Sequence, residues 1–253
     1  MLIFQQPPET RYDLRFTIAG IPVRVHPLFW VMTLLFGASS RGLFNLLIWV
    51  GVVFVSILVH ELGHALAMRW FGMPSRIVLH LSGGLTVPEP VSWGNQWANV
   101  SLRSNQEILV SLAGPGAGFL LAGLVMLAVV AAGGSVIISA LFGIIPFPTA
   151  ALPFGGNTAN VIVTILLWVN IFWGLINLMP VFPLDGGQVA RNVLLKADPL
   201  DGVRKSLWIS VIAGTVLAVA GLLLLGSIYM ALLFGFLAFQ SYQSIQGRSG
   251  FGY

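Results

Sequence analysis

The sequence has 253 residues, 57% hydrophobic and only 8% charged, with a net charge of +4 and a mean hydropathy of +0.92. This composition excludes an ordinary soluble domain, and the basic residues are too scattered for a nucleic-acid-binding stripe, so a lipid bilayer is the expected surrounding. The chain has no cysteine, which excludes disulfides and thiolate metal sites and leaves His, Asp and Glu as the available metal ligands.

Six apolar segments predict about six transmembrane helices in chain order. They cover residues 27–38, 43–71, 107–132, 159–179, 206–226 and 228–243. A helix needs about 20 apolar residues to cross a bilayer, so the first segment is short for a span. The stretch 135–148 is broken by prolines and is predicted to be a loop or a re-entrant element. The N-terminus lacks the pattern of a cleaved signal peptide.

The basic residues predict the orientation of these spans. With six spans, both termini, residues 72–106 and residues 180–205 lie on one side of the membrane. These stretches and their flanks hold eleven of the twelve basic residues, and only Arg41 lies opposite. Because positively charged loops stay in the cytoplasm, we expect a multi-pass protein of the cell membrane with both termini cytoplasmic.

The second segment carries ionisable side chains where an apolar span should have none. It contains the pattern His60-Glu61-Leu62-Gly63-His64. On a helix, His60 and His64 lie one turn apart on the same face and can bind one zinc ion. Glu61 is then placed to take a proton from an attacking water and return it to a leaving amine. The alternative is that the two histidines only form hydrogen bonds inside a helical bundle.

A zinc site needs a third protein ligand, and Asp185 is the best candidate in this sequence. It lies in the stretch NLMPVFPLDGGQVAR, where Pro180 and Pro183 interrupt the helix. Two glycines follow it and allow close approach of the backbone. His60 lies about 26 Å along the second span, near the cytoplasmic end where the fourth span also finishes. The alternative for Asp185 is an N-cap ahead of a helix over 186–196.

These motifs resemble the site-2 protease family of intramembrane zinc metalloproteases, peptidase family M50. The matching residues are HELGH at 60–64 and NLMPVFPLDGG at 177–187. Weaker likenesses are IPVRVHPLFW at 21–30, LSGGL at 81–85 and EILVSLAGPGAG at 107–118. The third of these lacks an asparagine that often follows the Gly-Pro pair in the family.

The resemblance implies an all-α polytopic fold with a core of three helices carrying the zinc site and a short membrane-associated β-hairpin or strand near residues 76–88. The core would cover about residues 20–195, and a helical pair at 206–243 would follow it. The whole chain, residues 1–253, would then be a single membrane-embedded domain without a PDZ or CBS domain.

The resemblance also implies a role for each site residue. His60, His64 and Asp185 would hold one Zn²⁺ per chain, and Glu61 would be the catalytic base. Asn177 would position the substrate or stabilise the oxyanion, since an amide near a metal can donate to developing negative charge. The alternative for Asn177 is an ordinary polar contact between helices.

The expected function is zinc-dependent hydrolysis of transmembrane or membrane-associated proteins within the bilayer. The LSGGL stretch would offer an edge strand to an extended substrate, or it is simply a turn in the cytoplasmic loop. The expected partners are the substrate and the lipid bilayer, no nucleic acid is expected, and any gating partner is unknown. An ion-coupled or proton-coupled transporter is the alternative, because buried ionisable residues and broken helices also mark ion pathways. A catalytically inactive membrane scaffold is a third reading.

Overall fold

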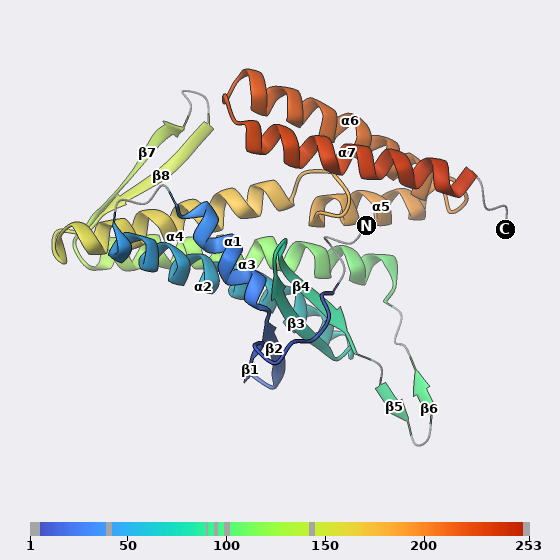
Figure 1. The fold of residues 1–253 in the computed structure, drawn as a ribbon, viewed down its shortest axis with the longest axis horizontal. Helices are drawn as coiled ribbons and strands as arrows, with labels where there is room; N and C mark the ends of the chain where they lie inside the picture. The colour runs from blue at the N-terminus through green and yellow to red at the C-terminus, as the bar shows by residue number, and fades with distance from the viewer. Residues whose placement is uncertain are drawn as a thin grey trace. The chain divides into compact units, whose positions relative to one another are not determined.

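The computed structural model describes residues 6–38, 42–89, 91–93, 96–98, 102–141 and 145–249. These residues form seven helices and eight strands (Figure 1). The helices are α1 (Pro27–Phe36), α2 (Leu43–Trp70), α3 (Ser104–Ala131), α4 (Gly156–Asn177), α5 (Asp185–Ala197), α6 (Gly202–Leu223) and α7 (Ile228–Ser249). The strands are β1 (Leu14–Ile18), β2 (Ile21–Val25), β3 (Ser75–His80), β4 (Gly83–Pro88), β5 (Val91–Trp93), β6 (Gln96–Ala98), β7 (Ser135–Leu141) and β8 (Ile145–Ala151).

Among the described residues, five helices are long and apolar enough to cross a membrane: α2, α3, α4, α6 and α7. Each has at least 20 residues in its apolar stretch, which matches the hydrocarbon thickness of a bilayer. The prediction of a helical, multi-pass membrane protein is therefore confirmed.

The first predicted span is a short helix, because α1 has only ten residues and covers about 15 Å. Its first turn nevertheless packs near the middle of α2, where the Phe29 and Phe54 rings have centroids 6.1 Å apart, and its later residues lie near the start of α2. Strand β2, which precedes α1, pairs with β3, the strand that follows the C-terminal end of α2. Near the other end of α2, the Trp49 indole donates to the Thr33 carbonyl of α1 at 3.0 Å. The chain therefore runs along α2 over residues 27–36 without forming a full-length helix.

Contacts divide the chain into two compact units. The first comprises residues 1–101 and 113–174, and the second comprises residues 102–112 and 175–253. The first unit holds α1, α2, all the described strands and most of α3 and α4. The second holds α5, α6 and α7. The prediction of a single domain is not tested by this division and stays a prediction.

The first unit contains a four-stranded sheet in the order β1-β2-β3-β4, with β2 and β3 parallel and the other neighbours antiparallel (Figure 1). Alternate residues of β2, among them Val23 and Val25, are buried against a core that includes Phe29 of α1 and Ile57 of α2. The sheet thus packs on α2. The predicted hairpin near 76–88 is confirmed as β3 and β4, but the partner strands β1 and β2 were not predicted.

The stretch 135–148 forms strand β7 and most of β8 rather than a loop, with residues 142–144 outside the described part. The run Val136, Ile137 and Ile138 favours a strand because β-branched side chains suit extended backbone. Pro146 and Pro148 lie in β8, where the sheet has only two strands and a missing N–H can face away from the partner.

The second unit is built around the antiparallel pair α6 and α7, which lie side by side in Figure 1. Small residues let the two helices approach closely, since Gly214 lies against Ala238 and Gly221 lies against Met230. The predicted C-terminal helical pair is therefore present, with α6 beginning at Gly202 and α7 extending to Ser249.

His80, at the end of β3, is expected to make stability depend on pH. Its pKa is lowered from 6.5 to about 4, mainly by burial and also by the positive charges of His26 and Arg24. The unfolded chain takes up a proton at this histidine near pH 6.5, whereas the folded chain resists it. Stability from this group is therefore present above pH 6.5 and is lost as the pH falls toward 4.

We expect His80→Gln to lose less thermal stability than the wild type between pH 7.5 and pH 5, when unfolding is measured in detergent. The difference should be a few degrees, corresponding to on the order of 1 kcal/mol after solvent screening is allowed for. Equal losses of thermal stability in the two proteins would show that the pKa of His80 is not lowered in the folded chain.

Candidate metal centre

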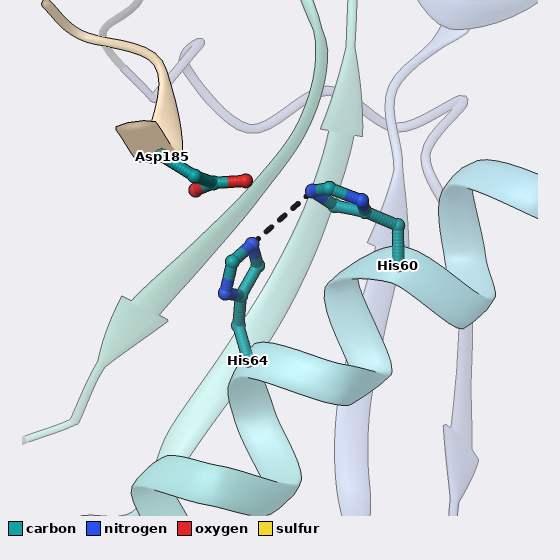
Figure 2. Close-up of side chains that lie close together, drawn as sticks. All are labelled: His60, His64 and Asp185. Carbon is teal, nitrogen blue, oxygen red and sulfur yellow. Dashed lines mark hydrogen bonds between the residues drawn. The ribbon is translucent and has the colours of Figure 1, made fainter. Parts of the chain in front are cut away.

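Helix α2 carries a pair of buried histidines that face each other. His60 and His64 are 4% and 8% exposed, and their Nε2 atoms lie 3.2 Å apart. The helix has no proline, and its i, i+4 spacing puts the two rings on one face. Figure 2 shows both imidazoles turned toward the same point from successive turns of the helix.

This separation fits a shared metal ion. Two nitrogens bound to tetrahedral zinc at about 2.0–2.1 Å lie about 3.3 Å from each other. The observed 3.2 Å between the Nε2 atoms is close to that value. The pair can therefore ligate one zinc ion without rearrangement of α2.

Glu61 is held against strand β4 of the same unit. Its side chain is 5% exposed, and its Oε2 accepts a hydrogen bond of 2.8 Å from the Thr86 hydroxyl. Gly84 lies directly beside the carboxylate, where a Cβ atom would overlap both Cγ and Oε1 of Glu61. The predicted base therefore follows His60 directly in α2, and its carboxylate is fixed by the sheet.

The backbone of α3 approaches His64 so closely that only glycine fits at position 114. A Cβ atom on Gly114 would overlap Nε2 and Cε1 of the His64 ring. The ring is buried and cannot simply swing away. We therefore expect Gly114→Ala to weaken zinc binding by at least about 10-fold, comparable to the loss of a group that orients a ligand.

The control for this substitution is Gly116→Ala, two residues along the same helix, where a Cβ atom would meet nothing within 4 Å. Zinc affinity is measured by competition with a chromophoric chelator in detergent. Wild-type affinity in Gly114→Ala would mean that His64 is not a ligand in the orientation described here.

A polar contact braces α2 one turn before His60. The Asn170 amide of α4 donates to the Ser56 hydroxyl at 2.9 Å, and both side chains are buried. Within a bilayer such a bond has no water to compete with it, so it holds the two helices in register. Ser56 and His60 share one face of α2, and the contact therefore supports the position of the histidine pair.

Asp185 is the first residue of α5, in the second unit. The N-cap position belongs to Leu184, whose side chain makes no capping hydrogen bond. The alternative prediction, that Asp185 is an N-cap, is therefore wrong. The helix begins at Asp185, one residue before the predicted start at 186. The predicted close approach of the backbone is confirmed, since Cβ atoms on Gly186 and Gly187 would overlap backbone atoms of residues 178–182.

The loop before Asp185 is fastened to α6. The Phe182 N–H donates to the Ser210 hydroxyl at 3.0 Å, and Ser210 donates to the Ser206 carbonyl at 2.9 Å. Ser210 is 1% exposed. The position of the loop that leads into α5 therefore depends on a helix that the motif does not include.

Asn177 is the last residue of α4 and is 9% exposed. Its burial agrees with either predicted role, substrate positioning or a contact between helices, so its function stays a prediction.

Sequence reasoning missed three residues that shape this centre: Thr86, Gly84 and Gly114. Gly84 and Gly114 lie in the LSGGL and AGPGAG stretches, so glycine-rich segments were a usable signal for close backbone approach. Thr86 gave no signal, because one threonine in a strand has no distinctive pattern.

Comparisons with known proteins agree with these observations. A model of peptidase family M50 matches residues 48–220, more than half of the chain. The zinc metalloprotease MJ0392 of Methanocaldococcus jannaschii is 28% identical over 190 residues, which are 73% of this chain and 46% of that protein. This chain thus spans about half the length of that curated relative.

A solved structure described as a site-2 protease from Methanocaldococcus jannaschii has a similar fold. The TM-score is 0.55 with 23% sequence identity, and the match covers 92% of this chain and 95% of that chain. The predicted fold class is therefore confirmed. The transporter alternative finds no support in these comparisons.

Proposed function

Because this chain belongs to peptidase family M50, we propose that it is a zinc metalloprotease that hydrolyses peptide bonds of transmembrane or membrane-associated proteins. The observation that supports this proposal most strongly is the buried pair His60 and His64. Their Nε2 atoms lie 3.2 Å apart in a helix long enough to span a membrane. Glu61 lies between them in the sequence and provides the carboxylate that hydrolysis needs.

The proposed zinc ligands are His60, His64 and Asp185. Two imidazole nitrogens and one carboxylate oxygen form a donor set that could hold a metal ion. This number and type of ligands is typical of catalytic zinc, which keeps one position open for water or substrate. When bound, zinc acts as a Lewis acid that polarises a carbonyl and makes a water acidic enough to be deprotonated near pH 7.

The chain's own residues carry the proton transfers. Glu61 takes a proton from the attacking water and returns it to the nitrogen of the leaving amine. We propose that the Asn177 amide donates to the oxyanion of the tetrahedral intermediate or orients the substrate. Its burial at the end of α4 supports a role inside the protein.

We propose that the substrate binds as an extended strand along β4. This strand is the outermost in the sheet order β1-β2-β3-β4 and carries Thr86 and Gly84, which contact Glu61. A transmembrane helix must unwind before its backbone can reach a catalytic site, and an edge strand can supply hydrogen bonds to the unwound segment.

The proposed orientation places both termini and the proteolytic site toward the cytoplasm, as the distribution of basic residues favours. The absence of cysteine makes this testable by single substitutions. In intact cells, an impermeant maleimide should label Phe154→Cys, whereas Leu200→Cys should react only after permeabilisation. The reverse pattern would overturn the orientation.

The function is tested with purified full-length chain in proteoliposomes that contain a panel of single-pass membrane proteins. We expect cleavage that stops when a chelator removes zinc and returns when zinc is restored. Zinc-loaded protein that cleaves no member of the panel, or cleavage that continues in zinc-free protein, would contradict the proposal.

A further inference from the structure

Thr86 of strand β4 contacts Glu61, the proposed catalytic base, through its hydroxyl group. Its hydroxyl lies 2.8 Å from Oε2 of Glu61 and 3.1 Å from the carbonyl oxygen of the same residue. A hydroxyl has one hydrogen, and the carboxylate is the stronger and nearer acceptor. Thr86 therefore donates to Oε2 and anchors the end of the Glu61 side chain.

Glu61 is confined from a second direction by Gly84. The carboxylate lies so close to this glycine that a Cβ atom would overlap Oε1. A free glutamate side chain has many rotamers, and fixing it in one of them costs conformational entropy. Strand β4 thus supplies both a hydrogen bond and a flat backbone surface that restrict the carboxylate.

We propose that Thr86 is a positioning residue for catalysis: its hydroxyl fixes the Glu61 carboxylate in the orientation that takes a proton from the attacking water. The proposal rests on the proposed function, because it needs Glu61 to be the base. It also gives β4 a second role beside substrate binding, since the strand that receives the substrate would hold the base.

The test uses two substitutions that differ in one group. Thr86→Val keeps the shape of the side chain and removes the donor. We expect kcat to fall about 10-fold to 100-fold, because a small displacement of a reacting group has effects of this size. KM and zinc affinity should stay within about twofold of the wild type, since neither depends on this hydroxyl. Thr86→Ser restores the donor and should recover most of kcat.

Thr149→Val is the matched control. Thr149 also lies in a strand, and its hydroxyl donates across the hairpin to the Ile137 carbonyl at 3.1 Å. Its loss should leave kcat unchanged. A merely structural role for Thr86 would lower the thermal midpoint and zinc affinity together, which are measured on the same preparations, whereas a positioning role lowers kcat alone.

The outcomes separate this proposal from the function on which it rests. If Glu61→Gln cleaves as fast as the wild type, the proposed function fails. If Glu61→Gln is inactive and Thr86→Val has wild-type kcat, only the role of Thr86 is wrong. A rise in KM with unchanged kcat would overturn the proposal by assigning Thr86 to substrate binding, and equal defects in Thr86→Ser and Thr86→Val would also overturn it.

Discussion

Replacing Glu61 by glutamine is expected to lower kcat by about 10²-fold to 10⁴-fold, the range typical for loss of a general base. Glutamine has nearly the same shape, and its amide oxygen can still accept the hydrogen bond that Thr86 donates to Oε2. The buried position and the space beside Gly84 are therefore kept. What is lost is the ability to take a proton from water.

The measurement is cleavage of one membrane substrate in proteoliposomes, with zinc content determined on the same sample. Zinc should remain bound in Glu61→Gln, because His60 and His64 are unchanged. Glu107→Gln is the control, since Glu107 lies in the first turn of α3 and has no proposed role. Wild-type turnover in Glu61→Gln would contradict the proposed proteolytic mechanism, whatever the zinc content.

The histidine pair and its helix could be predicted from the sequence because their geometry is local. The spacing of His60 and His64 determines the relative position of the rings once the segment is helical, and a long apolar run makes it helical. The interruption of the chain before α5 was predictable for the same reason, since two prolines and two glycines mark it, although the helix starts at Asp185 and not at 186.

The surroundings of the pair could not be predicted, because they depend on contacts between distant residues. Strand β2 pairs with β3, which lies more than fifty residues later in the sequence, and the sequence of neither strand indicates which strand it pairs with. The contact of Thr86 with Glu61 likewise joins a strand to a helix 25 residues earlier. Such pairings follow from packing of the whole unit rather than from local propensity.

Segment 27–38 was counted among the transmembrane spans for a different reason, whereas α1 is too short to be one. Its apolar segment was already short for a span, and the helix ends at Phe36 with Gly37 as its C-cap. An apolar composition indicates that a segment is buried away from water. The length of the helix depends instead on the residue at which the helix ends.

Replacing Asp185 by alanine is expected to weaken zinc binding by at least about 100-fold, more than the loss typical of a group that only orients a ligand. The structure assigns Asp185 to the first turn of α5, at the end of a loop that Ser210 fastens through Phe182. Alanine is tolerated at the first turn of a helix, and Asp185 is not the N-cap. Loss of metal without loss of α5 would therefore identify the carboxylate as a ligand.

Zinc per chain is measured after equilibrium dialysis against a zinc buffer, together with helical content by circular dichroism. Asp201→Ala is the matched control, because Asp201 is also acidic and precedes a helix, where its side chain makes no capping bond. His60→Ala should lose zinc to a similar degree as Asp185→Ala. Since the two residues are 125 positions apart in the sequence, equal losses from both would join two separate segments in one metal site, whereas wild-type affinity in Asp185→Ala would require another residue to complete the ligand set.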